Sequence, residues 1–168
     1  SSQQVSVSAL PVVSFTGLSL KYCINASPGH LTGNPSGGVF SGPGISGTIF
    51  YPETAGAGGP YNIVYSYTDP GTGCSNSATQ QVTVHEIPSV SISAVSDTIC
   101  PGTSTSISLG FTGTGPWNYS INNGPVETSS INPTVLPVSP AVTTTYEVTP
   151  FSDANCIAGI WDSVAAGS

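Results

Sequence analysis

Four cysteines are the residues whose type and spacing best suit chemistry in this 168-residue chain. Cys23 and Cys74 are 51 positions apart, and Cys100 and Cys156 are 56 positions apart. Such pairs form either disulfides or a metal site. A zinc site usually combines a CxxC motif with nearby histidines, and this chain has no CxxC and no histidine near a cysteine. The pattern therefore favours disulfides, which place the protein in an oxidising compartment.

Enzymatic chemistry has few residues to use. Nucleophilic catalysis needs an oriented base beside the nucleophile, and the only imidazoles belong to His30 and His85. No G-x-S-x-G elbow occurs, and no acid–base pair is clustered in the sequence. Residues 42–47 match G-x-G-x-x-G, but a strand-like segment follows where a dinucleotide site requires a helix. We therefore expect a glycine-rich turn, no catalytic residue and no cofactor.

Asp69 and Asp153 lie in equivalent turns, each shortly before the second cysteine of a pair. A calcium site needs six to eight oxygen ligands, usually from clustered carboxylates, and each turn supplies one aspartate. The expectation is that each aspartate hydrogen-bonds its own turn backbone and that no metal is bound.

Charge and composition narrow the fold and the partners. The formal net charge is −7, and Lys21 is the only lysine or arginine, so no basic surface for nucleic acid or anionic lipid can form. No apolar run is long enough for a membrane-spanning helix. Strong helix formers are scarce. The strand-forming residues Val, Ile, Tyr and Phe occur in short stretches, which 20 glycines and 15 prolines separate. The composition therefore predicts an all-β protein.

An internal repeat organises the chain. Residues 3–23 align with residues 80–100 at an offset of 77, without a gap, and nine of the 21 positions are identical. The repeat predicts two modules, residues 1–86 and residues 87–168. Of the three pairings that four cysteines permit, it selects Cys23–Cys74 and Cys100–Cys156, one disulfide in each module.

The repeat also gives a meaning to the first residues. The segment at 80–84 is expected to be the closing strand of the first module, so residues 1–9 are interpreted as the closing strand of a module that precedes this chain. The alternative is that they form the first strand of module one.

Strand patterns fill in the modules. Tyr61, Ile63, Tyr65 and Tyr67 alternate and should share one face of the penultimate strand of module one, with Val82 and Val84 on the last strand. In module two the expected strands carry these residues: Ile107 and Leu109; Trp117, Tyr119 and Ile121, ending at the turn of residues 122–124; and Tyr146 and Val148. A buried tryptophan on a central strand is typical of immunoglobulin-like sandwiches, so we expect Trp117 in the core.

The sequence resembles a known repeat. The carrying segments are LTGNPSGGVFSGPGI (residues 31–45) and YPETAGAG (51–58) in module one, and TICPG (98–102) and FTGTGPW (111–117) in module two. They are similar to the tandem Ig/PKD-like repeat modules of Bacteroidetes surface adhesins exported by the type IX system, including gliding-motility adhesins. The resemblance implies two immunoglobulin-like (PKD-like) β-sandwich modules in an extracellular, cell-surface protein, and it transfers no catalytic residue.

The expected function is that of a non-catalytic repeat segment, a stalk or spacer that supports adhesion or gliding. Its partners would be neighbouring modules of the same chain and an external surface or polysaccharide. The alternative is a carbohydrate-binding accessory module of a secreted hydrolase. That function needs an exposed aromatic platform, for which Trp161 and Tyr51 are the candidates.

Two short motifs resemble the D-[S/T]-aliphatic signal for O-glycosylation in the same phylum. They are Asp97-Thr98-Ile99 and Asp162-Ser163-Val164. The resemblance implies that Thr98 and Ser163 carry glycans.

Overall fold

The computed structural model describes residues 1–158 of the chain, and these residues are almost entirely β-structure. The chain divides into two compact units, Ser1–His85 and Glu86–Ser168. The boundary expected from the repeat lay one residue later. Among the described residues, no helix is both long enough and apolar enough to cross a membrane.

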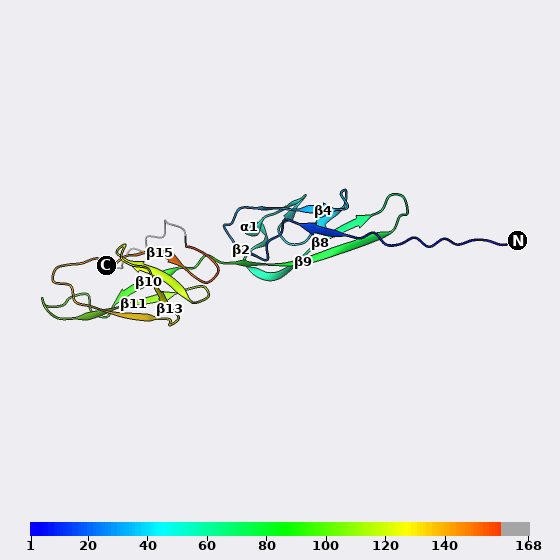
Figure 1. Cartoon of the computed structure of the whole chain (residues 1–168). Helices are drawn as coiled ribbons and strands as arrows, with labels where there is room; N and C mark the ends of the chain where they lie inside the picture. The colour runs from blue at the N-terminus through cyan, green and yellow to red at the C-terminus, as the bar shows by residue number, and fades with distance from the viewer. Residues whose placement is uncertain (159–168) are drawn as a thin grey trace. The chain divides into compact units, whose positions relative to one another are not determined.

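Unit 1 contains ten elements. They are β1 (Ser14–Thr16), β2 (Lys21–Cys23), β3 (Gly29–His30), β4 (Thr32–Asn34), β5 (Val39–Ser41), β6 (Ile45–Ser46), β7 (Ile49–Phe50), α1 (Pro52–Ala55), β8 (Gly58–Thr68) and β9 (Ser75–His85). The main sheet has the order β2-β9-β8-β5, and the smaller sheets are β1-β4 and β3-β7-β6. The antiparallel hairpin of β8 and β9 is the longest feature of this unit (Figure 1).

The core of unit 1 follows from the alternation along this hairpin. Ile63 and Tyr65 on β8 are buried, as are Val82 and Val84 on β9, while Tyr61 and Tyr67 pack partly buried against them. The predicted face of the penultimate strand is therefore confirmed. Aromatic and aliphatic residues from the other strands complete the cluster: Phe15, Leu31, Phe40 and Phe50.

Residues 8–24 run beside β9 and in the same direction. β2 pairs in parallel with the end of β9, matching Lys21 with Thr83 and Cys23 with His85. Four hydrogen bonds, written donor to acceptor, join the two segments in step: Asn76 Nδ2 to Pro11 O (2.9 Å), Gln80 Nε2 to Phe15 O (2.7 Å), Thr83 N to Leu20 O (3.0 Å) and Ile24 N to His85 O (2.8 Å). The chain therefore arrives at one end of β9 and leaves unit 1 at the other end.

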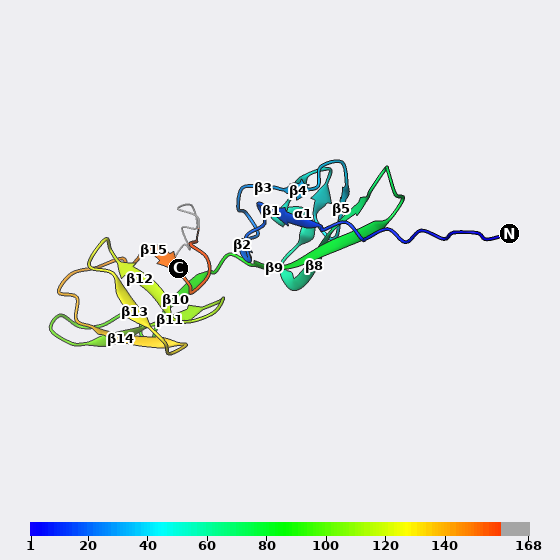
Figure 2. The same ribbon diagram turned by 45° about the vertical axis from the view of Figure 1, so that its right-hand side comes forward.

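Unit 2 is built from two three-stranded sheets (Figure 2). Its strands are β10 (Val90–Ala94), β11 (Thr105–Phe111), β12 (Trp117–Ile121), β13 (Glu127–Ser129), β14 (Thr134–Val138) and β15 (Val148–Ser152). One sheet has the order β10-β11-β14 and the other β13-β12-β15. All the pairings in these two sheets are antiparallel.

Aromatic rings join the two sheets of unit 2. Phe111 of β11 stacks on Trp117 of β12 at 5.1 Å between ring centroids and on Phe151 of β15 at 5.5 Å. The indole Nε1 of Trp117 donates to Thr112 O at 2.9 Å, so the buried ring keeps its hydrogen bond. The expectation that Trp117 belongs to the core is confirmed, and Ile107, Leu109 and Tyr119 are buried as well.

Candidate functional site

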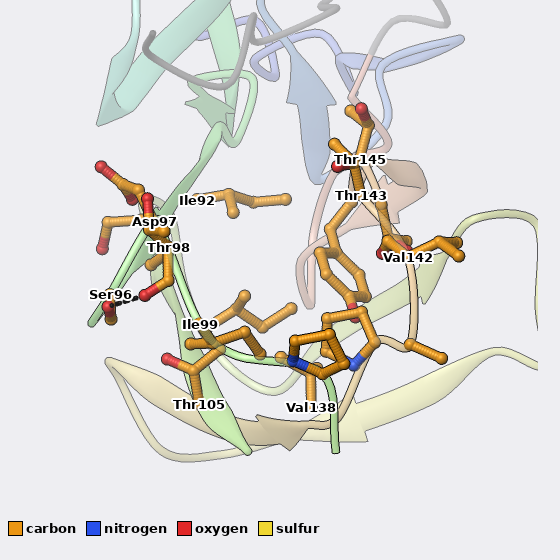
Figure 3. Close-up of a pocket in the computed structure, with 18 residues that line it drawn as sticks. Ile92, Ser96, Asp97, Thr98, Ile99, Thr105, Val138, Val142, Thr143 and Thr145 are labelled. Atoms are coloured by element: carbon orange, nitrogen blue, oxygen red, sulfur yellow. Dashed lines mark hydrogen bonds between the residues drawn. The ribbon is translucent and has the colours of Figure 1, made fainter. Parts of the chain in front are cut away.

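Unit 2 has a cleft of about 650 Å³ at the end of the sheets where Thr105 of β11 pairs with Val138 of β14 (Figure 3). Its volume lies within the range of small-molecule sites in proteins, roughly 300–1,000 Å³. Two connecting loops form it: residues 95–104 between β10 and β11, and residues 139–147 between β14 and β15.

Hydroxyl groups occur on both walls of the cleft. Ser96, Asp97 and Thr98 stand on one side, and Thr143 and Thr145 stand on the other (Figure 3). The first wall is held partly by a hydrogen bond from Ser96 Oγ to Thr98 O at 2.9 Å. The second is anchored to the β12–β13 turn by Asn122, whose Nδ2 donates to Thr145 O at 3.1 Å.

The floor of the cleft is apolar. Ile92, Ile107 and Val138 come from three neighbouring strands, and half-buried Tyr146 adds an aromatic ring to the lining. Asp97 is the only charged side chain among the lining residues. An apolar base with hydroxyl walls and one carboxylate, that of Asp97, suits an uncharged, polyhydroxylated ligand better than an anion, because no cationic group lines the cleft.

Tyr146 departs from its predicted position. The alternation with Val148 placed both residues on one strand, but β15 begins at Val148 and Tyr146 lies in the loop before it. Two hydrogen bonds close this loop onto the β12–β13 turn: Asn122 N donates to Glu147 O, and Glu147 N donates to the side-chain Oδ1 of Asn122. The sequence carried no signal for the cleft, because its two loops are far apart in the chain.

The cysteines also differ from the prediction. Cys23 and Cys156 are disulfide-bonded, whereas Cys74 and Cys100 carry free thiols. Neither of the pairs chosen from the repeat, Cys23–Cys74 or Cys100–Cys156, is therefore formed, and neither unit has a disulfide between its own two cysteines.

Strand geometry gives the reason in unit 1. Cys23 pairs with His85 at the end of β9, while Cys74 immediately precedes Ser75 at its start. Eleven residues of extended strand separate the two positions, which corresponds to about 35 Å. A disulfide requires Cα atoms within roughly 7 Å, so the two cysteines cannot meet.

The same reason applies in unit 2. Cys100 lies in the β10–β11 loop, at the Thr105 end of β11. Cys156 lies at the opposite end of that strand, in a turn whose Ala154 N donates to Thr114 O at 2.9 Å. The seven residues of β11 keep the two ends about 20 Å apart.

The two aspartates hydrogen-bond the backbone of their own turns, as expected. Asp69 Oδ1 accepts from the backbone N–H groups of Gly71 at 2.7 Å and Thr72 at 3.0 Å. In unit 2, Asp153 is buried and its carboxylate accepts from three backbone N–H groups, those of Thr114, Asn155 and Cys156. Across residues 1–158, no group of three or more His, Cys, Asp or Glu residues could hold a metal ion.

The remaining predicted site residues are scattered. Thr98 is exposed on the cleft wall, while Ser163 and Trp161 lie outside the described residues. Tyr51 is half-buried in unit 1, with its backbone N–H bonded to Gly44 O, so it is not a freely exposed platform. Residues 42–47 form a turn and the short strand β6, and β7 follows.

His30 is exposed in β3, and His85 ends β9.

Comparison with known proteins found no matching family model, no similar curated protein and no similar solved structure.

Proposed function

We propose that this chain is a non-catalytic spacer segment of an extracellular adhesive protein, built from two immunoglobulin-like modules in series. The observation that carries the proposal is the path of the chain through unit 1. The chain arrives beside Cys74 at the start of β9 and leaves at His85, about 35 Å further on. A module whose two ends lie apart extends the length of a polypeptide, as a stalk must.

The same path suits a module that carries tension. A pull on the two ends of unit 1 draws β2 toward one end and β9 toward the other. Because β2 and β9 are parallel, the hydrogen bonds between them lie across the pulling direction and must break together. Thr83 N to Leu20 O at 3.0 Å and Ile24 N to His85 O at 2.8 Å are two of these bonds.

Redox state supports an extracellular setting. The disulfide-bonded state of Cys23 and Cys156 is compatible with a protein outside the reducing cytosol. The resemblance of both modules to repeats of type IX-exported gliding adhesins points to the same kind of location, at a cell surface.

Single-molecule stretching of the chain from its two ends, after reduction of its cysteines, tests the mechanical role, because a disulfide at Cys23 would bear the force in place of the β2–β9 hydrogen bonds. We expect unit 1 of the Thr83→Pro variant to unfold at a clearly lower force than wild type, because proline removes the N–H that bonds Leu20 O. The matched control is Phe50→Leu, which weakens the core away from the β2–β9 contact. Equal unfolding forces for Thr83→Pro and this control would contradict the proposal.

A cellular experiment tests the spacer role directly. Both units of the natural protein are replaced by two unrelated modules of the same length, and adhesion of the cells is measured. A spacer predicts that adhesion is retained after replacement and declines when the units are deleted without replacement. Loss of adhesion in the length-matched replacement would mean that these units contact the target themselves.

The cleft in unit 2 favours a second candidate, binding of a neutral carbohydrate. Its hydroxyl walls, apolar floor and half-buried Tyr146 match the chemistry of a sugar, which has polar hydroxyls and apolar C–H faces. A panel of soluble oligosaccharides is titrated into the chain while the NMR signals of residues 92–107 and 138–146 are followed. A binder should shift these signals, and Tyr146→Ala should weaken binding at least tenfold. A panel without any shift removes this candidate.

A further inference from the structure

Two valines near the beginning of unit 1 are exposed in a pattern that normally belongs to a core. Val5 is 85% exposed and Val7 is 95% exposed, and they alternate with Gln4 and Ser6. Strict alternation of apolar and polar residues is the pattern of a strand with one buried face. In unit 1 this face has no partner, and the segment is drawn as an extended trace in Figure 1.

The internal repeat identifies the environment that this pattern fits. At the offset of 77, Val5 and Val7 correspond to Val82 and Val84, which are 0% and 2% exposed in the core of unit 1. The offset of 77 relates strands of the two units as well as their sequences. It maps β1 onto the middle three residues of β10, and each is the first strand of its unit.

Unit 1 cannot bury the two valines itself, because β9 already occupies the equivalent position. The following residues are also held away from its core: Ser8 O lies 4.0 Å from the Cys74 thiol, and Pro11 O accepts from Asn76 Nδ2. Residues 3–7 therefore point beyond the β8–β9 turn, at the end of unit 1 opposite His85.

We propose that residues 3–7 are the closing strand of another module of the same kind, located N-terminal to unit 1 in the same polypeptide. The proposal deepens the spacer function and rests on it. The segment would pair antiparallel with a strand equivalent to β8, as β9 does when Val82 lies opposite Tyr61 and Val84 opposite Gly58. Val5 would then face an aromatic side chain of that module, and its sheet would continue directly into unit 1.

The same placement gives the free thiol of Cys74 a partner. In unit 1 the first cysteine, Cys23, lies beside His85 in the pairing of β2 with β9. The repeat aligns His85 with Ser8. The first cysteine of the N-terminal module would therefore lie beside Ser8, next to Cys74. Cys23, in the equivalent position, is itself disulfide-bonded.

Formation of this bond is an oxidation. The two thiols lose two protons and two electrons, one S–S bond forms, and a disulfide-donating oxidoreductase is reduced to its dithiol. The bond would join consecutive modules and would not close a loop within one.

Hydrogen exchange of the backbone amides in residues 3–7 tests the strand. In the 168-residue chain these amides should exchange without protection, and in the full natural chain exchange should slow by roughly 100-fold or more. Non-reducing peptide mapping adds a second measurement. Cys74 should be alkylated in the 168-residue chain and linked to the first cysteine of the N-terminal module in the full chain. Neither readout depends on adhesion, so failure of the spacer function leaves this test intact.

Lysine substitutions at two kinds of exposed valine test whether Val5 and Val7 are buried in the full chain. The double variant Val5→Lys/Val7→Lys should lower the Tm of the N-terminal module in the full chain and leave the 168-residue chain unchanged. Val12→Lys is the control, because Val12 is as exposed as Val5 but its repeat counterpart, Ser89, is an exposed polar residue. Equal effects of the two substitutions would overturn the proposal. So would unprotected amides in the full chain, a natural chain without such a module, or protection that depends on protein concentration, which would indicate a second copy.

Discussion

At the scale of single residues, the hydroxyl of Tyr65 is the best-defined polar group in the core of unit 1. Its Oη donates to Pro35 O at 2.5 Å and accepts from Gly38 N at 2.8 Å. The ring is buried, and a Cβ at either Gly33 or Gly38 would collide with it. One tyrosine therefore holds the loop before β5 at Pro35 and Gly38, and its ring leaves no room for a side chain at Gly33 or Gly38.

Removal of this hydroxyl should cost stability without disturbing the packing. Tyr65→Phe leaves the Gly38 N–H and the Pro35 carbonyl without their partner, and we expect a loss of about 1–3 kcal/mol in the free energy of unfolding. Urea denaturation measures it as a lower midpoint at unchanged slope. Tyr67→Phe is the control and should change stability little, because the Tyr67 hydroxyl makes no side-chain hydrogen bond in the described part of the structure.

Asp69 gives unit 1 a small dependence on acidity. Hydrogen bonds from the backbone N–H groups of Thr72 and Gly71 lower the pKa of Asp69 below its ordinary value of 3.8. A lowered pKa in the folded state contributes stability above the unfolded pKa, and this contribution disappears as the pH falls through the folded pKa. The stability difference between wild type and Asp69→Asn should therefore shrink between pH 6 and pH 3. A stability difference that stays constant over this range would contradict this prediction.

The thiol states predict a simple labelling pattern. Native 168-residue chain treated with a maleimide should be modified at the exposed Cys100 and at the half-buried Cys74, the latter more slowly. Cys23 and Cys156 should react only after reduction. Mass spectrometry of the labelled peptides reads this directly. Label on Cys23 before reduction would contradict the bonded state described above.

At the scale of secondary-structure elements, the turn after β12 shows how residue choice sets a hairpin. Asn122 and Asn123 both have positive φ, 49° and 56°, and Gly124 N donates to Ile121 O at 2.8 Å. Asparagine tolerates this left-handed conformation better than other side chains do, and the twist of such a turn suits the strands that it joins. The sequence alone marked this turn correctly.

Substitution at Asn123 should separate backbone preference from side-chain bonding. Asn123→Val forces a β-branched residue to positive φ and should destabilise unit 2 by about 1–2 kcal/mol. Asn123→Gly should be tolerated, since glycine adopts this region freely. Thermal melting followed by circular dichroism distinguishes the two. A valine variant as stable as the glycine variant would show that the turn relaxes into another form.

Sequence reasoning succeeded where the signal was local. Alternation identified the buried faces of β8, β11 and β12, and the asparagine pair identified a turn. It failed where distant segments meet. The parallel alignment of β2 with β9 decides which cysteines can approach each other, and no local pattern records that alignment. The cleft was missed for the same reason, because it lies between two loops about 40 residues apart.

At the scale of the whole molecule, the scarcity of cationic residues creates a useful probe. Trypsin cleaves after lysine or arginine, and Lys21 is its only target in the chain. Lys21 lies in β2 and is paired with Thr83, so cleavage requires β2 to detach from β9. Digestion of the native protein should therefore be slow and should yield only residues 1–21 and 22–168.

Destabilisation of unit 1 should accelerate this cleavage. Val82→Ala removes two methyl groups from a fully buried position, and a loss of about 2 kcal/mol would raise the cleavage rate about 30-fold. Val135→Ala, at an exposed position of unit 2, should leave the rate unchanged. Gel electrophoresis over time measures both. Equal rates would mean that the Lys21 site opens independently of the core.

Residues 8–24 also cover the edge of β9 and so protect it from pairing with other copies of the protein. A long strand at the margin of a sheet offers free N–H and C=O groups to any neighbour, and such margins are where β-proteins aggregate. Here β9 is flanked along its outer side by the chain's own incoming segment, which pairs with it from Lys21 to Cys23 and contacts it earlier through Pro11 and Phe15. At this margin of the sheet, a second copy of unit 1 therefore finds no free edge of β9 to pair with.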